Sequence, residues 1–144
     1  MLWHKVCLGW TIFMMAWVTT LMAGTMETQE WKGNASLESK ERYVVVHTLK
    51  EWTNLWHETL GQEAPFVDFA HHDAVCIFLG YGADWLYNIH FDEGVIQEEK
   101  FVIRYALQPL VLELATPFRG KGQYKMKLYP KGEREVVIQK GGEW

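Results

Sequence analysis

The chain has 144 residues and a mass of 16.9 kDa, which is enough for one domain of ordinary size. Its formal net charge of −4 excludes nucleic acid as an expected partner, because a net acidic protein repels the phosphate backbone. A disulfide framework is also excluded, since Cys7 falls in a segment that is expected to leave the mature protein. The remaining cysteine, Cys76, lies in an apolar run and is expected to be a small core residue rather than a nucleophile.

Residues 1–23 have the composition of a signal peptide or membrane anchor. Lys5 and the free amine give a positive start, and an apolar run broken only by threonines follows over residues 6–24. A positive start, an apolar stretch and small residues at its end are typical of a signal peptide. The run also approaches the roughly 20 residues that span a bilayer, so an uncleaved anchor is the alternative. Both interpretations predict an extracytoplasmic protein that is periplasmic, secreted or membrane-anchored. If the segment is not cleaved, residues 6–24 are the only part expected to contact the membrane.

Residues 24–41 show no apolar period and are expected to form a flexible tether. A single domain is then expected over residues 42–144. It begins with Tyr43-Val44-Val45-Val46, whose β-branched side chains predict a short buried strand.

The clearest local signals predict a helix over residues 49–60. Thr48 and Glu51 have the spacing of a capping box, in which each side chain accepts a hydrogen bond from the other residue's backbone N–H. Gly61 stands where a left-handed residue commonly ends a helix. Between these signals, large apolar side chains recur at helical spacing: Leu49, Trp52, Leu55, Trp56 and Leu60.

The rest of the chain predicts strands. The run from Ala74 to Leu79 is apolar on both faces, as in a central strand, and residues from Trp85 to Phe91 alternate. Asp92-Glu93-Gly94 is either a turn or a bulge, Glu98-Glu99-Lys100 is the competing turn, and the sequence leaves these possibilities open. Further strands are expected over residues 101–107, 111–115 and 124–129, and a turn at residues 131–133 is expected to close a hairpin with residues 135–138.

One early helix followed by about six strands predicts an α+β fold, with the helix packed on a largely antiparallel sheet.

The histidines are the first candidates for chemistry. His71 and His72 are adjacent, and His90 lies elsewhere. Zinc sites need ligands that converge, and adjacent residues of a strand point in different directions, so a polar loop before a buried strand is the favoured interpretation. A small metal-dependent or hydrolytic enzyme that uses His71, His72 and His90 is the alternative.

Nucleophilic catalysis has weaker support. The two serines, Ser36 and Ser39, lie in the expected tether, and no nucleophile-elbow motif is present. We therefore expect no catalytic residue, no cofactor and no bound metal.

A basic stretch near the C-terminus includes Lys125 and Lys127, which the strand period places on one outward face. Lysines of this kind commonly protect a solvated sheet edge. A docking patch for an acidic partner is the alternative.

Two segments are candidates for partner binding. Gly80 and Gly82 allow a sharp turn beside aromatic side chains, and rigid aromatic side chains dominate binding hot spots. Pro117 fixes the backbone of the second segment, over residues 116–121. The candidate partner-binding residues are Tyr81, Asp84, Trp85, Phe118, Arg119 and Lys121. Two alternatives stay open: the exposed aromatic residues bind a sugar or small ligand, or the rings of Tyr81 and Trp85 fold into the core.

From about Tyr43 to Gln139 the chain resembles the C-terminal domain family of the bacterial protease complex subunit PrcB. The features that carry the resemblance are, in order, Glu51-Trp52-Thr53-Asn54-Leu55-Trp56, Val67-Asp68-Phe69, the apolar strand ending at Gly80, and Thr116-Pro117-Phe118. The resemblance implies a non-enzymatic α+β module of an exported protein, with an exported partner such as a protease. The family usually has a longer Gly/Thr-rich loop after the central strand, so the identity of the partner does not carry over.

Overall fold

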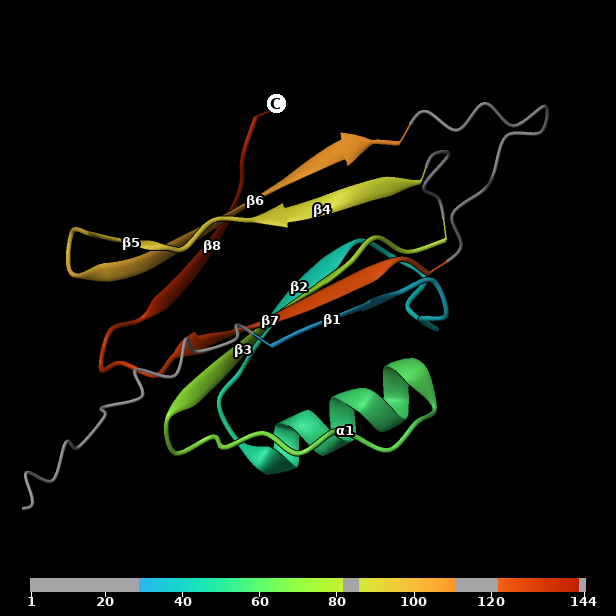
Figure 1. Cartoon of the computed structure of the whole chain (residues 1–144), viewed down its shortest axis with the longest axis horizontal. Coiled ribbons are helices and arrows are strands. Elements are labelled where there is room, and N and C mark those ends of the chain that lie inside the picture. Colours follow the sequence, from blue (N-terminus) through green and yellow to red (C-terminus); the bar gives the residue numbers. More distant parts are fainter. Residues whose placement is uncertain (1–28, 82–85, 111–121, 143–144) are drawn as a thin grey trace, which may run out of the picture.

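The computed structural model describes residues 29–81, 86–110 and 122–142 (Figure 1). In these residues the chain forms one helix, α1 (Leu49–Leu60), and eight strands. The strands are β1 (Glu30–Gly33), β2 (Arg42–Val46), β3 (His72–Phe78), β4 (Tyr87–Phe91), β5 (Val95–Gln97), β6 (Lys100–Pro109), β7 (Tyr124–Pro130) and β8 (Val136–Lys140).

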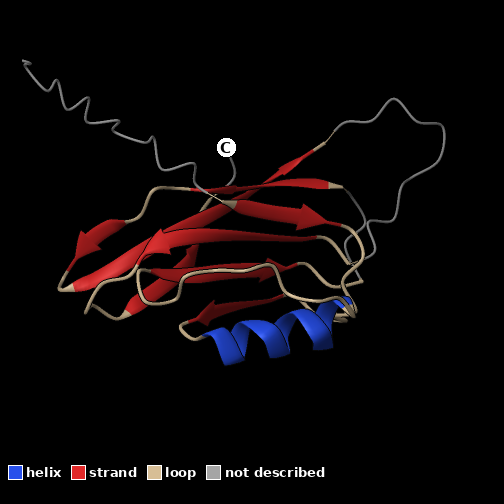
Figure 2. Cartoon of the chain, turned by 60° about the horizontal axis from the view of Figure 1, so that its bottom comes forward, coloured by secondary structure: helices blue, strands red, loops and turns tan. Residues whose placement is uncertain are grey.

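The elements form three layers (Figures 1 and 2). The first sheet has the order β1-β7-β3-β2 and is antiparallel throughout. The second sheet has the order β4-β6-β5, and β8 pairs with β6 in parallel. Helix α1 covers one face of the first sheet, and the second sheet covers the other face. The predicted α+β class and largely antiparallel pairing are confirmed, but a single sheet of about six strands is wrong, because eight strands divide between two sheets.

Strand β3 shows why the first sheet is buried on both faces. Ala74, Cys76 and Phe78 pack in the cluster under the helix, while Val75 and Ile77 pack against the second sheet. All five are fully buried. The prediction of a central strand and of a buried Cys76 is confirmed, and burial raises the pKa of the Cys76 thiol.

The predicted helix and its capping box are confirmed. Thr48 Oγ1 accepts a hydrogen bond from the Glu51 N–H at 3.2 Å, and Glu51 Oε2 accepts one from the Thr48 N–H at 3.1 Å. A further bond from the backbone N–H of His47 holds the pKa of Glu51 below its usual value. Trp52 and Trp56 are buried under the sheet as the spacing predicts, whereas Leu49 is half exposed.

The prediction of a tether over residues 24–41 is wrong for its described part, residues 29–41. Residues 30–33 form β1, which pairs with β7, and Trp31 packs 5.2 Å from the ring of Trp52. Ser36 is buried, and its N–H donates to the carbonyl of Gly122. Strand β1 escapes a search for periodicity because it is short and carries one apolar side chain among polar ones.

Of the two candidate turns after β4, the second is the turn and the first is a bulge. Glu98 and Glu99 have φ of 50° and 64° and form the tight turn between β5 and β6. Between the pairs Phe91↔Tyr105 and Val95↔Val102, three residues of one strand face two of the other. Residues 92–94 are therefore a β-bulge within one long hairpin arm.

The prediction that β8 closes a hairpin with β7 is wrong. Strand β8 pairs with β6 in the second sheet, with Phe101 opposite Val136 and Tyr105 opposite Lys140. The connection after Pro130 therefore crosses between the sheets. Residues 136–138 are a short run of β-branched side chains that suits either pairing, so the local sequence cannot choose between them.

Residues 1–23 and the predicted strand over residues 111–115 lie outside the described residues. In the part of the chain that the structure describes, no helix is long and apolar enough to cross a membrane.

A comparison of Gly61 with Gly80, which share a left-handed backbone conformation, tests whether the segment before β2 is packed against the domain. Gly61 has φ of 62° with nothing near its missing side chain, whereas a Cβ on Gly80 (φ 74°) would lie 2.8 Å from the Lys40 carbonyl carbon. We expect Gly61→Ala to lower the free energy of unfolding by about 1–2 kcal/mol through backbone strain alone. Gly80→Ala should cost at least about 1 kcal/mol more, through overpacking. Urea denaturation of both variants measures this, and equal losses would mean that the 36–40 segment is not packed against the domain.

Candidate functional site

Of the predicted partner-binding residues, Tyr81 is described, and Asp84, Trp85, Phe118, Arg119 and Lys121 lie outside the described residues. The side chain of Tyr81 is 45% exposed, and its hydroxyl donates to the Leu37 carbonyl at 2.8 Å. Its backbone N–H points to the Ser39 carbonyl at 3.4 Å. Tyr81 therefore lies half exposed against the segment before β2, just beyond the C-terminal end of β3.

The structure keeps His71 and His72 apart from His90. His71 Nδ1 lies 2.6 Å from Asp68 Oδ2, and this hydrogen bond lowers the pKa of Asp68. His90 lies on β4, where its ring contacts Gln108 Oε1 at 2.9 Å. In the described ranges no group of three or more His, Cys, Asp or Glu side chains could hold a metal ion.

The prediction that Lys125 and Lys127 face outward is wrong. Both point from β7 toward the second sheet, because β7 lies inside the first sheet and its other face covers the helix. Lys125 Nζ donates to the Ile89 carbonyl at 2.9 Å. Lys127 is 4% exposed and lies 3.2 Å from a Glu93 carboxylate oxygen. Neither lysine is available as an edge guard or as part of a docking patch.

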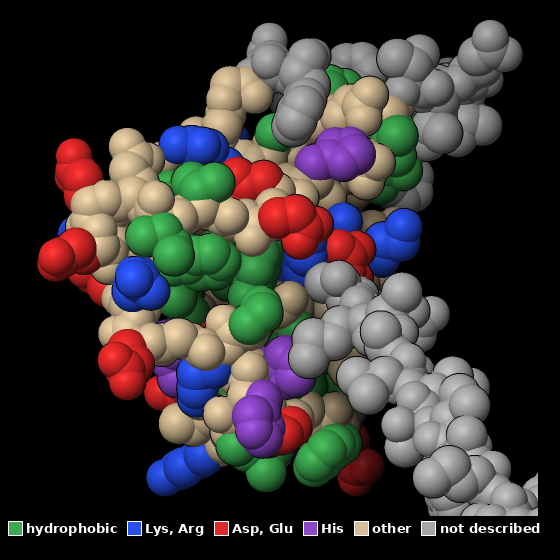
Figure 3. All heavy atoms as spheres, turned by 60° about the vertical axis from the view of Figure 1, so that its left-hand side comes forward, with side chains coloured by type: hydrophobic (Ala, Val, Ile, Leu, Met, Phe, Trp, Pro, Cys, Tyr) green, Lys and Arg blue, Asp and Glu red, His purple; other side chains and the backbone are tan. Residues whose placement is uncertain are grey.

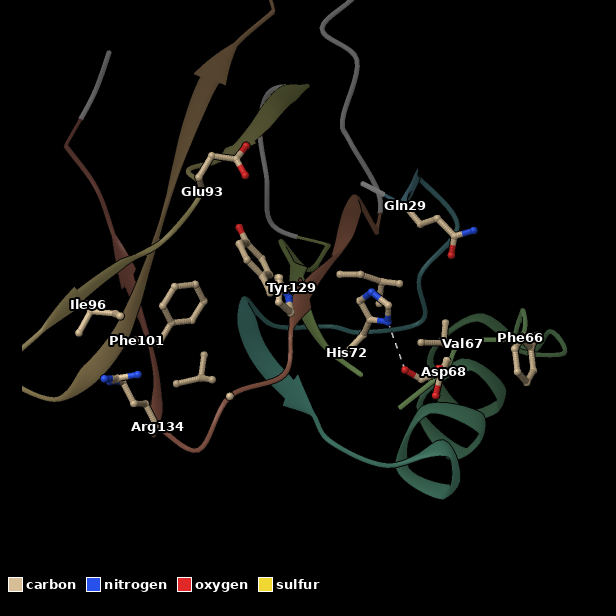
Figure 4. A pocket seen from close by; sticks show the side chains of 14 residues that line it. Gln29, Phe66, Val67, Asp68, His72, Glu93, Ile96, Phe101, Tyr129 and Arg134 are labelled. Carbon is tan, nitrogen blue, oxygen red and sulfur yellow. Dashed lines mark hydrogen bonds between the residues drawn. The ribbon is translucent and has the colours of Figure 1, made fainter. Parts of the chain in front are cut away.

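A cleft of about 730 Å³ opens at the end of the layered fold where β3 begins and β7 ends (Figures 3 and 4). One wall comes from the loop between α1 and β3, and the opposite wall comes from β5, β6 and the connection into β8. The lining residues are Gln29, Phe66, Val67, Asp68, His72, Glu93, Ile96, Phe101, Leu128, Tyr129, Pro130, Gly132, Arg134 and Val136.

The rim of the cleft carries unusually exposed apolar side chains. Phe66 is 83% exposed on one side, and Ile96 is 63% exposed on the other (Figure 4). Between them lies the end of β7, which forms the floor of the cleft: buried Leu128 faces the helix layer and buried Tyr129 faces the second sheet. Single exposed apolar residues are common on protein surfaces, but two that face one hollow with an apolar floor are typical of a binding site.

Tyr129 joins the floor to the second sheet. Its hydroxyl donates to the Asp92 carbonyl at 2.6 Å, and its ring meets the ring of Phe101 edge-on at 5.9 Å. Lys127 Nζ lies 5.1 Å from the centre of the same ring. Burial raises the pKa of the Tyr129 phenol, and the nearby carboxylates of Asp92 and Glu93 raise it further.

The charged groups of the cleft differ in whether they are compensated. Asp68 bonds to His71, and Glu93 pairs with Lys127. Within the described residues Arg134 forms no ion pair or hydrogen bond through its side chain, and it lies on the wall opposite Asp68 (Figure 4). The cleft thus presents apolar surface with the Asp68 carboxylate on one wall and, on the other, an exposed guanidinium that forms no ion pair with the described residues.

The sequence did not predict this cleft, because its residues come from separate segments that meet only in the folded chain. The sequence indicates only weakly that the apolar residues Phe66 and Ile96 are exposed. Phe66 follows a proline in a loop and Ile96 stands close to a turn, so neither is part of a periodic apolar pattern that would predict burial.

Searches of family models, of curated proteins and of solved structures find no match for this chain. The function is therefore inferred from the geometry of the cleft.

The raised pKa of Tyr129 predicts a fall in stability at alkaline pH. Above the ordinary tyrosine pKa of 10.0 the unfolded chain loses the phenol proton while the folded chain keeps it. Unfolding then releases a proton, so the free energy of unfolding falls as the pH rises above about 10. Tyr129→Phe should show a shallower fall between about pH 10 and 11.5, measured by urea denaturation at each pH. Tyr105 and Tyr124 are expected to supply the slope that remains. Burial and the Glu41 carboxylate raise the pKa of Tyr105 to about 12, and burial raises the pKa of Tyr124.

At neutral pH the same variant should lose about 0.5–1.5 kcal/mol, since the Asp92 carbonyl loses its donor. An alkaline slope identical to that of the wild type would contradict the placement of Tyr129.

Proposed function

We propose that this chain is a non-enzymatic, extracytoplasmic binding module and that the cleft is its ligand site. The observation that carries the proposal is the apolar cleft of about 730 Å³ between Phe66 and Ile96. Sites for small ligands commonly have volumes of about 300–1,000 Å³, apolar walls and a few polar groups that orient the ligand.

Binding in the cleft has a clear source of free energy. Burial of a Phe or Ile side chain contributes about 1.5–3 kcal/mol, and both rim residues are largely exposed without a ligand. Contact of the ligand with Leu128 and Tyr129 costs little conformational entropy, because both side chains are already ordered in β7. We therefore keep the hypothesis that exposed aromatic residues bind a small ligand, but propose Phe66 as the aromatic contact in place of Tyr81 and Trp85.

The chemistry of the lining favours binding over catalysis. None of the described lining residues is a serine, threonine or cysteine, and the carboxylates of Asp68 and Glu93 already have partners. Of the three histidines proposed for an enzyme, His72 alone lines the cleft.

An accessory role beside an exported protein, such as a protease, rests on the resemblance to the PrcB C-terminal domain family. Such a partner has a separate surface available to it. Tyr81 follows the C-terminal end of β3, whereas His72, at the start of the strand, lines the cleft. A protein partner at the Tyr81 end and a ligand in the cleft would therefore not compete.

A neutral fluorescent dye tests the cleft. N-phenyl-1-naphthylamine should bind to the purified protein, and its emission should increase as it leaves water. Phe66→Gln and Ile96→Gln should each weaken this binding by about fivefold, since each removes rim surface that the dye covers. The matched control is Leu37→Gln, because Leu37 is also 61% exposed but does not line the cleft. Equal effects of all three changes would exclude the cleft as the binding site.

A reporter fusion tests the extracytoplasmic location. Residues 1–28 joined to an alkaline phosphatase that lacks its own signal should give active enzyme, because that enzyme forms its disulfides only outside the cytoplasm. The paired substitutions Phe13→Arg and Met14→Arg should lower the activity at least tenfold, since each arginine costs about 2.5–3.5 kcal/mol in an apolar membrane segment. Activity that does not depend on the apolar run would contradict a targeting role.

A further inference from the structure

We propose that the ligand of the cleft is an amphipathic carboxylate, a molecule with one hydrocarbon chain and one carboxylate, and that Arg134 binds its head group. The inference rests on the proposed function, since it takes the cleft to be a ligand site. It adds the chemical class of the ligand and its orientation.

The first step is the charge balance of the lining. Asp68 and Glu93 have their own partners, at 2.6 Å and 3.2 Å, and His72 Nδ1 lies 3.2 Å from the Asp68 carbonyl. Arg134 is the charged side chain of the cleft without a polar partner among the described residues. A ligand that brings one negative charge would compensate it, whereas a neutral or cationic ligand would not.

The second step is the kind of anion. A guanidinium offers a planar fork of N–H donors that matches the two oxygens of a carboxylate. Arg134 is exposed at the margin of the cleft, on the same side as Ile96 and Phe101, so its guanidinium is open to an anion that enters from solvent (Figure 4).

The third step is the orientation of the chain. The carboxylate of Asp68 lies on the wall opposite Arg134 and would repel a second anionic group (Figure 4). The head group therefore belongs at Arg134, and the hydrocarbon chain passes over the end of β7, from Tyr129 on the side of the second sheet to Leu128 and Val67 on the side of the helix. A ligand with one charged end and one apolar end fits this arrangement, and a ligand with carboxylates at both ends does not.

Displacement of N-phenyl-1-naphthylamine measures the preference directly. Decanoate, 1-decanol and decyltrimethylammonium have the same chain length and differ in the charge of the head group, and each is used below its micellar concentration. For the wild type we expect decanoate to bind at least about tenfold more tightly than 1-decanol, the range of a hydrogen bond to a charged group. Shortening decanoate to octanoate should weaken binding by roughly tenfold, because two methylenes leave the apolar floor.

Variants assign the preference to one residue. Arg134→Gln should reduce the decanoate-to-decanol ratio to about one, while Arg134→Lys should keep part of it. The matched control is Lys50→Gln, which removes the same charge from an exposed position in the first turn of α1, outside the cleft.

The outcomes separate this inference from the proposed function. Equal binding of decanoate and 1-decanol by the wild type, or tighter binding of decyltrimethylammonium, would overturn the carboxylate while leaving the cleft as a ligand site. An unchanged ratio in Arg134→Gln would overturn the role of Arg134. If none of the three amphiphiles displaced the dye, the inference would fail, and if the dye also bound independently of Phe66 and Ile96, the proposed function would fail with it.

Discussion

The antiparallel pairing of β3 with β7 is the interaction on which the rest of the structure depends. Its register runs from His72↔Pro130 to Phe78↔Tyr124, and both strands lie inside the first sheet. Helix α1 covers one face of this pair and the second sheet covers the other. A pair of strands buried on both faces needs a partner layer on each side, since exposing either face would leave its apolar side chains in water.

The two strands meet the second sheet in different ways, and this difference produces the cleft. The side chains of β3 that face it are apolar, whereas β7 presents Lys125, Lys127 and Tyr129. Two of these polar tips donate to backbone carbonyls near the β4–β5 bulge, at Ile89 and Asp92. The ammonium group of Lys125 and the hydroxyl of Tyr129 thereby supply hydrogen-bond donors to two backbone carbonyls at the margin of the interface between the sheets. Beyond Tyr129 no such link follows among the described residues, and there the layers diverge around apolar surface.

Elements whose signals lie within a few residues of one another can be predicted from the sequence. The capping box of Thr48 and Glu51, the helix end at Gly61 and the buried strand through Cys76 were all predictable, and with them the α+β class. Each rests on hydrogen bonds or side-chain periods that a short segment completes internally. Tyr81 was recognised as a surface candidate for the same reason, since it follows a strand end at a glycine.

Four features depend on the folded chain: the division into two sheets, the inward direction of Lys127, the packing of Trp31 and the cleft itself. Each of these depends on contacts between distant residues, such as Phe101 with Val136 or Trp31 with Trp52. An alternating strand suits any partner with the same period, so the choice of partner carries no local signal. The cleft is the extreme case, because Phe66, Ile96 and Arg134 acquire a common environment only when a loop, a hairpin and a crossover connection meet at one end of the fold.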